Sequence, residues 1–548
     1  MRPSLDDVAG RSFDVIVIGG GINGAGIARE AQLRGYATLL VERDDFGAGT
    51  TSRATRLIHG GLRYLEHGEF GLVYESIAER EALVREVPHL VRPLRLLLPV
   101  YLGDRRPPWM VQAGLAMYDL LSFRPGRGPL GKSLPRHRAM PLRALDAYEP
   151  GLRREGLRAA FVFSDAQAEF PERLVVEAVR DVVDAGGVAL NHVAADALLA
   201  PGGILHGLRL RETCSERSAD VSAKVVVNAA GPWVDQVLAG SDAERHERLI
   251  GGTKGSHLVA EWPGGPAHAI FATAQADGRP FFILPWYRYT LVGTTDLRYD
   301  GDPSDARATP AEVRYLLDEA SRLFPQTPLT RGDVLYTYSG VRPLPAADRG
   351  RTARPGDEAA ITRRHIVIDH VKRGGPPGLL SVVGGKLTTY RSLARIAMLA
   401  IAKHAQPSAP PVDLTQFPAP PLPAWERGRV GEGDPLAIYG PRAAEVRALA
   451  DAEASLRGPV CAHNPEILAQ VAYAVAREHA ATLGDVLLRR LPIGWSKCHA
   501  LDGAERCAQV MARRLGWDDR RVTGEVAAYE RELRRTLVPL DAIGAGDP

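Results

Sequence analysis

The sequence predicts an α/β fold in which a Rossmann-like domain carries an inserted mixed-sheet domain and is followed by an all-α C-terminal domain. The first observation is a short β-branched run, 15–18, that leads directly into a G-x-G-x-x-G sequence. The second is the alternation of strand-like and helix-like patterns as far as about residue 400. The third is a proline-rich segment that cannot be helical and precedes purely helical patterns. We therefore expect an α/β region over 12–405, a linker over 406–424 and a helical domain over 425–548.

Three glycines fit a dinucleotide-binding turn. Gly19 permits a tight turn, Gly21 lets the backbone approach a pyrophosphate, and Gly24 lets the next helix pack against the strand. A helix that starts near Ile22 directs free N–H groups toward the phosphates. A second predicted strand ends in Glu42, 18 residues after Gly24, where a carboxylate can bind ribose hydroxyls. This register predicts a bound adenine dinucleotide. The alternative is a structural glycine turn in an α/β domain that binds no nucleotide.

Further segments extend this nucleotide domain. The small, hydroxyl-rich loop 47–52 can wrap a diphosphate and a ribityl chain, which favours FAD over NAD. A buried strand breaks into a small-residue turn at Gly231, a form that brings the chain past the cofactor again. A last buried strand, 379–383, ends in Gly384, Gly385 and Lys386. The apolar spacing after it predicts a helix over 387–404.

Five short blocks follow one another in the first 400 residues. They are 58–66 (IHGGLRYLE), 254–257 (KGSH), 293–296 (GTTD), 338–343 (YSGVRP) and 384–391 (GGKLTTYR). With the nucleotide-binding region, they resemble the FAD-dependent (respiratory) glycerol-3-phosphate dehydrogenase family over roughly residues 12–400. The resemblance implies FAD as the cofactor. The residues then expected to bind it are Gly19, Gly21, Asn23, Gly24, Glu42, Thr50, Thr51, Ser52, Leu57, His59, Gly61, Gly231, Gly385, Lys386, Leu387 and Thr388.

The resemblance also implies a reaction, the oxidation of sn-glycerol 3-phosphate to dihydroxyacetone phosphate by hydride transfer to FAD. Such a reaction needs a base for the hydroxyl proton and an anchor for the phosphate dianion. Arginine binds phosphate oxygens through its planar fork. Arg63, Arg342 and Lys386 lie in blocks that match the family's substrate site, and Tyr64 adds a hydroxyl donor. For each cation, the alternative is an ion pair at the surface.

His59 is the first candidate for the base. It lies on a glycine-flanked turn beside the predicted flavin loop, and a neutral imidazole accepts a proton near pH 7. The alternative is that it only hydrogen-bonds the cofactor. His257 is the second candidate and is also expected to contact the substrate. The predicted catalytic set is thus His59, Arg63 and Arg342, while Lys386 at the start of the expected helix supplies positive potential where reduced flavin is negative.

Composition excludes several other classes. The chain of 548 residues is too long for one core, and its net charge of +3 gives no argument for nucleic acid. The scattered cysteines Cys214, Cys461, Cys498 and Cys507 predict isolated, reduced thiols and no metal site. The polar residues 1–11 do not resemble a signal peptide, and no window of about 18 apolar residues occurs. These features favour a cytoplasmic protein without a membrane-spanning helix.

The resemblance implies that electrons pass to a membrane quinone. Close relatives reduce dioxygen to peroxide, so an oxidase is a second possibility. Segment 105–124 is apolar, with arginines at both ends, and suits either a peripheral contact with the cytoplasmic face of the membrane or a buried core helix. An amine or amino-acid oxidase and a non-catalytic flavin-binding regulator are further alternatives. The cationic set argues against both. An amine or amino-acid oxidase would need a clamp for a carboxylate and not for a phosphate, and a regulator need not keep a complete anion-binding pocket.

The segment after the linker resembles the small helical domain of the same family. Asn464, Pro465 and Glu466 predict the start of a helix, because they combine a cap, an N1 proline and a first-turn acid. We expect this domain to act as a packing element or as the contact of a homodimer. Paired arginines such as Arg489 and Arg490 are expected on its solvated surface, and nothing near them indicates a nucleic-acid site.

Overall fold

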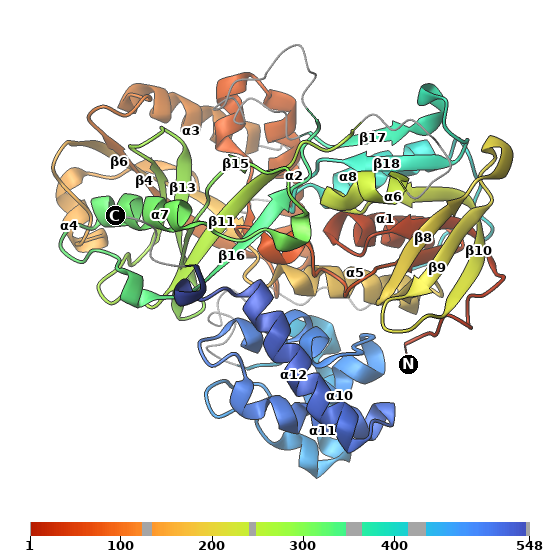
Figure 1. Cartoon of the computed structure of the whole chain (residues 1–548). Coiled ribbons are helices and arrows are strands. Elements are labelled where there is room, and N and C mark those ends of the chain that lie inside the picture. The colour runs from red at the N-terminus through yellow and green to blue at the C-terminus, as the bar shows by residue number, and fades with distance from the viewer. Residues whose placement is uncertain (1, 123–133, 240–247, 347–363, 415–433, 544–548) are drawn as a thin grey trace.

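The computed structural model describes residues 2–122, 134–239, 248–346, 364–414 and 434–543. Two sheets lie side by side, and a helical C-terminal domain packs below both of them in the view of Figure 1. Each sheet is assembled from segments that are far apart in the sequence. The predicted fold class, a Rossmann-like domain with an inserted mixed sheet and a helical C-terminal domain, is confirmed.

The first sheet carries the glycine motif. Its strands are β1 (Ser12–Ile18), β2 (Thr38–Val41), β7 (Val188–Leu190), β8 (Val193–Leu199), β9 (Gly207–Glu212), β10 (Ser218–Asn228), β17 (Ile366–Asp369) and β18 (Leu379–Val383). Strands β18, β10, β1, β2 and β7 are parallel neighbours in that order. Helix α1 (Ile22–Leu33) packs against α5 (Pro171–Asp184) and α8 (Tyr390–Ile401). Strands covered in this way are apolar on both faces, as 13–18 of β1 show by their burial.

The turn from β1 to α1 has the predicted form. Gly19 has φ +103°, and a Cβ there would lie 2.6 Å from the carbonyl oxygen of Ala229. A Cβ on Gly24 would lie 1.9 Å from the carbonyl oxygen of Gly19, so only glycine lets α1 approach the turn. The predicted positions of β2 and β18 are also confirmed. The helix expected to begin at Leu387 begins instead at Tyr390, because 387–389 form a turn.

The second sheet is mixed. Its strands are β3 (Leu57–Ile58), β4 (Arg92–Tyr101), β5 (Arg138–Ala139), β6 (Leu157–Gln167), β11 (Thr253–Ala260), β12 (Ala269–Thr273), β13 (Pro280–Trp286), β14 (Tyr289–Gly293), β15 (Leu297–Arg298) and β16 (Val334–Arg342). Strand β12 is parallel to β4, and the other pairs are antiparallel. Strands β11 and β16 place Thr253 opposite Arg342 and His257 opposite Tyr338. This register brings two of the sequence blocks side by side.

Several further helices pack against the two sheets. They are α2 (Phe70–Glu86), α3 (Pro108–Ser122), α4 (Leu145–Tyr148), α6 (Val234–Ala239) and α7 (Pro310–Leu323). The buried face of α7 combines apolar residues with Glu312 and Glu319, and a capping box between Thr309 and Glu312 fixes the start of the helix. Within the described ranges, no helix is both long and apolar enough to cross a bilayer.

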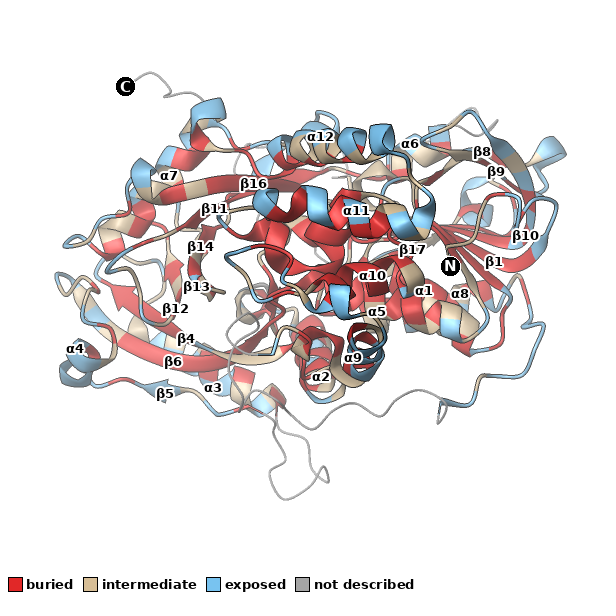
Figure 2. Ribbon diagram, turned by 90° about the horizontal axis from the view of Figure 1, so that it is seen from below, coloured by how far each residue is buried: buried red, intermediate tan, exposed pale blue. Residues whose placement is uncertain are grey.

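The C-terminal domain consists, over its described part, of helices joined by turns. The α-helices are α9 (Ala443–Ala452), α10 (Leu468–Arg477), α11 (Ala504–Leu515) and α12 (Asp519–Thr536). Figure 2 shows α10 buried between the other elements and α12 exposed along its outer side. The expected helix start at 464–466 is wrong by a few residues, because the chain is extended at Ile467 and becomes helical only after it.

Two arginines that were expected on the surface anchor this domain. Arg489 and Arg490 are 5% and 0% exposed, and both donate hydrogen bonds to Asp45 just after β2. Nearby, the Arg56 guanidinium lies 4.4 Å from the ring centroids of both Trp286 and Trp495. The expectation of a solvated face is therefore wrong for Arg489 and Arg490, because the buried carboxylate of Asp45 in the α/β region pairs with both.

Candidate active site

A cavity of about 570 Å³ opens at the carboxyl ends of β1 and β2, where Rossmann-like sheets bind nucleotides. Most of the predicted cofactor residues line it. They are Gly19, Gly21, Asn23, Glu42, Thr50, Thr51, Gly231, Gly385, Lys386 and Leu387. The chemistry of this lining suits a dinucleotide, since glycine turns leave room for a diphosphate and carboxylate and hydroxyl groups can bind sugars.

Glu42 is held at the rim of this cavity by backbone donors. The amides of Gly20 and Asp44 donate to its two carboxylate oxygens at 2.6 and 2.9 Å. Burial nevertheless raises the pKa of Glu42 to about 7. Asn23 donates to the carbonyl of Gly384 at 3.3 Å, while its Oδ1 is buried and has no partner among the described residues. A polar atom of this kind is available to a ligand, so the residues present fit FAD.

Two predicted cofactor residues, Gly24 and Ser52, do not line this cavity. Gly24 packs against the carbonyl of Gly19 and lies behind the cavity wall. Ser52 is buried and donates to the carbonyl of Gly47 at 2.7 Å, so its hydroxyl closes the loop and does not face the cofactor cavity. For these two positions the prediction of a direct contact is not supported by the cavity lining, because the turn and the loop use them internally.

A second cavity of about 260 Å³ adjoins the first. The two share lining residues, including Thr50, Pro343 and Lys386. Leu57, Gly61 and Thr388 of the predicted cofactor set line only this second cavity. The predicted substrate and catalytic residues also line it. These are His59, Arg63, Tyr64, His257, Arg342 and Lys386.

Arg342 is oriented by its neighbours. Its guanidinium donates to Asp296 Oδ1 at 3.0 Å and to Thr294 Oγ1 at 3.2 Å, and its side chain is 20% exposed. Across the cavity, Lys386 Nζ lies 3.8 Å from the ring centroid of Tyr64. Such a cation–π contact fixes the ammonium group. The site thus presents fixed cations to any molecule that enters it, as an anion-binding pocket requires.

The two candidate bases differ in environment. His59 lines the cavity, and its backbone amide donates to Thr388 Oγ1 at 3.1 Å. His257 is buried, stacks on Tyr338 at 4.7 Å between centroids, and lies 2.9 Å from Thr55 Oγ1 through Nε2. Burial, with the positive charge of Arg342, holds the pKa of His257 well below its usual range. His257 is therefore neutral at neutral pH and suited to hydrogen bonding.

Sequence reasoning missed several residues of this cavity. Arg53 and Arg279 line it, and Asp296 links Arg279 to Arg342 through its carbonyl and carboxylate oxygens. Asp296 lies in the GTTD block, and Arg53 directly follows the predicted flavin loop, so both carried a usable signal. Arg279 carried none, because it lies in the turn before β13 and only the sheet brings it to the site.

The chain is similar to known proteins in both sequence and structure. A family model described as FAD dependent oxidoreductase matches residues 14–391, and one described as C-terminal domain of alpha-glycerophosphate oxidase matches 434–522. A glycerol-3-phosphate dehydrogenase of Synechocystis sp. is 38% identical over 98% of this chain and 99% of its own length. The aerobic glycerol-3-phosphate dehydrogenase of Escherichia coli and a D-erythritol 1-phosphate dehydrogenase of Brucella abortus are also 38% identical, each over 72% of this chain and 75% and 74% of their own lengths.

The solved structure of a glycerol-3-phosphate dehydrogenase from Bacillus halodurans, complexed with FAD, superposes with a TM-score of 0.72. It is 25% identical and covers 99% of this chain and 98% of its own. The fold and the paired cavities therefore define an FAD-dependent oxidoreductase. More narrowly, the chain belongs to the FAD-dependent glycerol-3-phosphate dehydrogenase family.

Proposed function

We propose that this protein oxidises sn-glycerol 3-phosphate to dihydroxyacetone phosphate. The observation that carries the proposal is the cationic cavity that adjoins the cofactor cavity, with Arg63, Arg342 and Lys386 in its wall. A phosphate dianion bound there lies beside the cofactor cavity, because the two cavities share lining residues. The names of the Synechocystis and Escherichia coli relatives support the same substrate.

The roles of the residues follow from their placement. Arg342, already oriented by Asp296, binds the phosphate through its planar fork, and Arg63 and Lys386 add charge. We assign to His59 the removal of the proton of the secondary hydroxyl, because His59 lines the cavity that adjoins the cofactor cavity. His257 orients the substrate as a neutral hydrogen-bonding group. FAD, when bound, accepts the hydride.

The reaction is tested by anaerobic addition of candidate substrates to the purified holoenzyme, while its visible spectrum is recorded. We expect sn-glycerol 3-phosphate to bleach the flavin bands, and glycerol and alanine to leave them unchanged. Faster bleaching by erythritol 1-phosphate would move the substrate to the four-carbon phosphate of the Brucella relative. Bleaching by alanine alone would indicate an amino-acid oxidase. A spectrum unchanged by every compound would leave a flavin-binding regulator.

We further propose that a membrane quinone takes the electrons. A third cavity, of about 310 Å³ and mainly apolar, shares Leu62, Arg63, Phe271 and Pro280 with the substrate cavity. Its outer wall includes Met110 of α3. An apolar cavity next to the site of hydride transfer suits the ring and first isoprenoid units of a lipophilic quinone.

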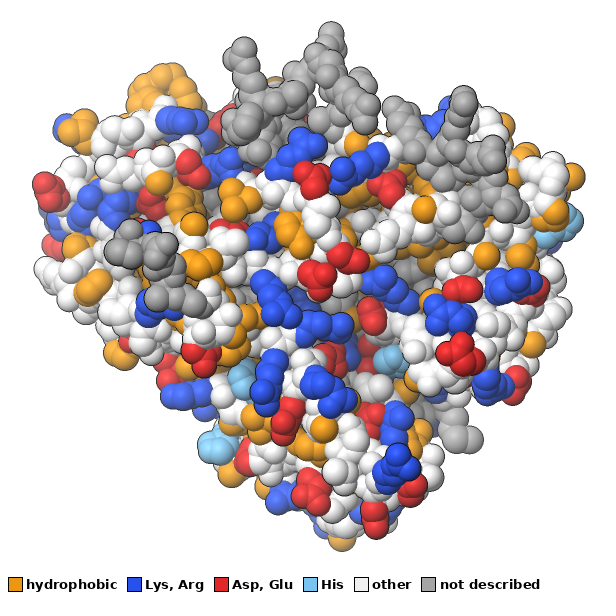
Figure 3. All heavy atoms as spheres, viewed as in Figure 1, with side chains coloured by type: hydrophobic (Ala, Val, Ile, Leu, Met, Phe, Trp, Pro, Cys, Tyr) orange, Lys and Arg blue, Asp and Glu red, His pale blue; other side chains and the backbone are white. Residues whose placement is uncertain are grey.

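Helix α3 supports a peripheral contact with the cytoplasmic face of the membrane. Trp109, Met110, Met117 and Leu120 of α3 are between 39% and 69% exposed. Figure 3 shows hydrophobic side chains gathered at the upper left, over α3. Leu115, by contrast, is 0% exposed and packs in the core, so the helix has one buried face and one apolar outer face. The exposed face of α3 thus supports the membrane contact, and its buried face supports the core helix, which were the two alternatives for this segment.

The acceptor is tested by steady-state assay of the same preparation with a short-chain ubiquinone and with dioxygen. We expect fast quinone reduction and little peroxide. Stoichiometric peroxide with slow quinone reduction would establish the oxidase alternative. A homodimer stays a prediction, which sedimentation of the holoenzyme checks.

A further inference from the structure

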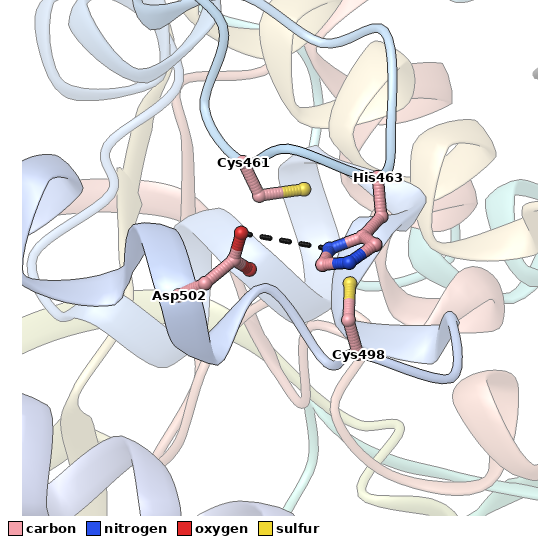
Figure 4. A group of neighbouring side chains, drawn as sticks. All are labelled: Cys461, His463, Cys498 and Asp502. Atoms are coloured by element: carbon pink, nitrogen blue, oxygen red, sulfur yellow. Dashed lines mark ion pairs between the residues drawn. The ribbon is translucent and has the colours of Figure 1, made fainter.

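Four side chains that no part of the proposed reaction uses come together in the C-terminal domain. They are Cys461, His463, Cys498 and Asp502, and they point toward one another in Figure 4. Each offers one ligand atom, and these atoms all lie within 4.8 Å of one another. The expectation of isolated thiols is therefore wrong for Cys461 and Cys498. The pattern was hidden in the sequence because a C-x-H pair and a C-x₃-D pair come from different loops.

Two loops build this cluster. Cys461 and His463 lie in the segment before α10, and Cys498 and Asp502 lie on either side of the turn that leads into α11. His499 and Ala500 have φ +51° and +53°, a conformation that residues other than glycine rarely adopt. This pair of left-handed residues turns the chain back, so that Asp502 faces the same point as Cys498.

We propose that Cys461, His463, Cys498 and Asp502 bind one divalent transition-metal ion of the zinc class. Thiolate, imidazole and carboxylate are the ligands that Zn²⁺ takes in proteins, and four of them make a tetrahedral site. In such a site the ligand atoms lie about 2.0–2.3 Å from the ion and thus about 3.3–3.8 Å from one another. His463 and Asp502 are exposed enough, at 61% and 38%, to make the small rotations that close the cluster.

Groups around the cluster orient the ligands. The side-chain amide of Asn464 lies 3.2 Å from the sulfur of Cys461 and 3.2 Å from the sulfur of Cys498, and donates to both. The backbone amide of Ala462 donates to Asp502 Oδ2 at 3.0 Å. Donors of this kind stabilise negative ligands and fix their direction in metal sites. They are the second observation that favours a metal, because Asn464 serves both sulfurs and does not cap a helix.

The ion would act on structure and not on the redox reaction. All four positions of a tetrahedral ion are filled by protein groups, which leaves no open position for a substrate. Both loops of the cluster also touch the turn between β13 and β14. Arg288 donates to the carbonyl of His463 at 3.2 Å, and the amide of Lys497 donates to the hydroxyl of Tyr289 at 2.8 Å. A metal ion would therefore fasten both loops to the substrate-binding sheet.

The test uses flavin-loaded enzyme, reduced with a phosphine, given Zn²⁺ and then freed of excess metal. We expect one zinc per chain by elemental mass spectrometry. X-ray absorption at the zinc edge should show two sulfur neighbours at about 2.3 Å and two nitrogen or oxygen neighbours at about 2.0 Å. Competition with a chromophoric chelator should show Asn464→Ala binding zinc about 10- to 100-fold more weakly. Cys498→Ser should bind more weakly still.

Cys214→Ser is the matched control, because this thiol is exposed and lies far along the chain from the cluster. It should bind zinc as the wild type does. Alkylation mapped by mass spectrometry gives a second readout: zinc should protect Cys461 and Cys498 while leaving Cys214 reactive. An unchanged flavin spectrum in each variant shows that it has folded.

Three results would overturn the proposal. The first is a folded, reduced wild type that retains no zinc. The second is equal zinc affinity in Cys498→Ser and the wild type. The third is an absorption spectrum without sulfur neighbours. A Cys461–Cys498 disulfide that forms in air and, once reduced, leaves a protein unable to take up zinc would identify a thiol pair in place of a metal site.

Discussion

Arg490 and Asp45 form a bidentate ion pair, at 2.6 and 2.9 Å, although 445 residues separate them in the sequence. Both side chains are wholly buried. Asp45 lies three residues after Glu42, just beyond β2, whose last residue borders the cofactor cavity. The pair therefore joins the C-terminal domain to the part of the nucleotide domain that is expected to hold the ribose.

Asp45→Asn should destabilise the protein strongly, because it removes the carboxylate that pairs with the buried Arg490, although Arg489 keeps its ion pairs with Asp485 and Glu532. Removing one partner of a buried ion pair costs about 3–5 kcal/mol. Urea denaturation followed by circular dichroism measures this loss. The exposed pair of Arg209 with Asp220 gives the control, and Asp220→Asn should change stability by about 0–1 kcal/mol. Equal, small losses of unfolding free energy in both variants would mean that the buried pair does not stabilise the contact between the two domains.

Glu42 should make the stability of the apoprotein depend on pH. Burial raises its folded pKa to about 7, above the ordinary value of 4.5. The stability that this group contributes is fully present below pH 4.5 and is lost as pH rises through 7. The difference in unfolding free energy between Glu42→Gln and the wild type should therefore shift in favour of the variant between pH 5 and pH 8. A pH-independent difference would contradict a buried carboxyl.

Arg342→Ala should weaken use of the phosphorylated substrate, since truncating one partner of a desolvated charge pair costs about 2–5 kcal/mol, on the order of 30- to 5,000-fold. The measurement is kcat/KM with sn-glycerol 3-phosphate, set beside glycerol, whose slow oxidation should hardly change. Arg209→Ala, at an exposed ion pair, is the control. An equal loss with both substrates would place Arg342 in support of the fold or the flavin.

The triple change Trp109→Ser, Met110→Ser and Leu120→Ser should release the enzyme from membranes. It should slow reduction of a long-chain quinone in vesicles and leave turnover with a water-soluble dye intact, because the dye needs no docking. Leu115 is left unchanged because it is core. The matched control replaces Ile204, Leu399 and Leu414 with serine, because these residues are 62–68% exposed and lie outside α3. Equal membrane binding by both triple variants would refute docking through α3.

His59→Asn and His257→Asn separate the two candidate bases by their pH profiles. If His59 is the base, its variant loses most of kcat and the acidic limb of the profile. His257 is held neutral, so its variant should mainly raise KM and keep the shape of the profile. Rapid-scan measurement of anaerobic flavin bleaching gives both rates. If His59→Asn keeps the acidic limb of the pH profile and His257→Asn loses it, then His257 is the base and His59 is not.

The nucleotide-binding half could be predicted from sequence because its signals are local. A buried strand, three glycines and a strand-end acid lie within thirty residues, and the positions of β2 and β18 follow from short apolar runs. The helix after Lys386 begins three residues later than the apolar spacing predicts, since 387–389 form a turn. The prediction that His59, His257 and Arg342 share one cavity rested on the family resemblance, because hydrophobic periodicity does not reveal which distant residues meet.

What sequence could not give are contacts between distant segments. Arg489 and Arg490 look like a solvated pair until Asp45 is brought to them by packing of the two domains. Two neighbours of Cys461, namely Cys498 and Asp502, come from a loop that begins more than thirty residues later. In both cases each residue is locally unremarkable, and only the tertiary arrangement supplies its chemistry.

The order of the parallel strands sets a constraint on synthesis of the chain. Strand β1 pairs with β10, which is completed only at Asn228, and β10 in turn pairs with β18 at 379–383. Lys386 and Leu387, beyond β18, complete the wall of the cofactor cavity. A ribosome must therefore release almost four hundred residues before the FAD site is complete. Until β10 has been synthesised, the edge of β1 that pairs with it stays unpaired. Added flavin should thus stabilise the full-length product and leave the stability of shorter nascent chains unchanged.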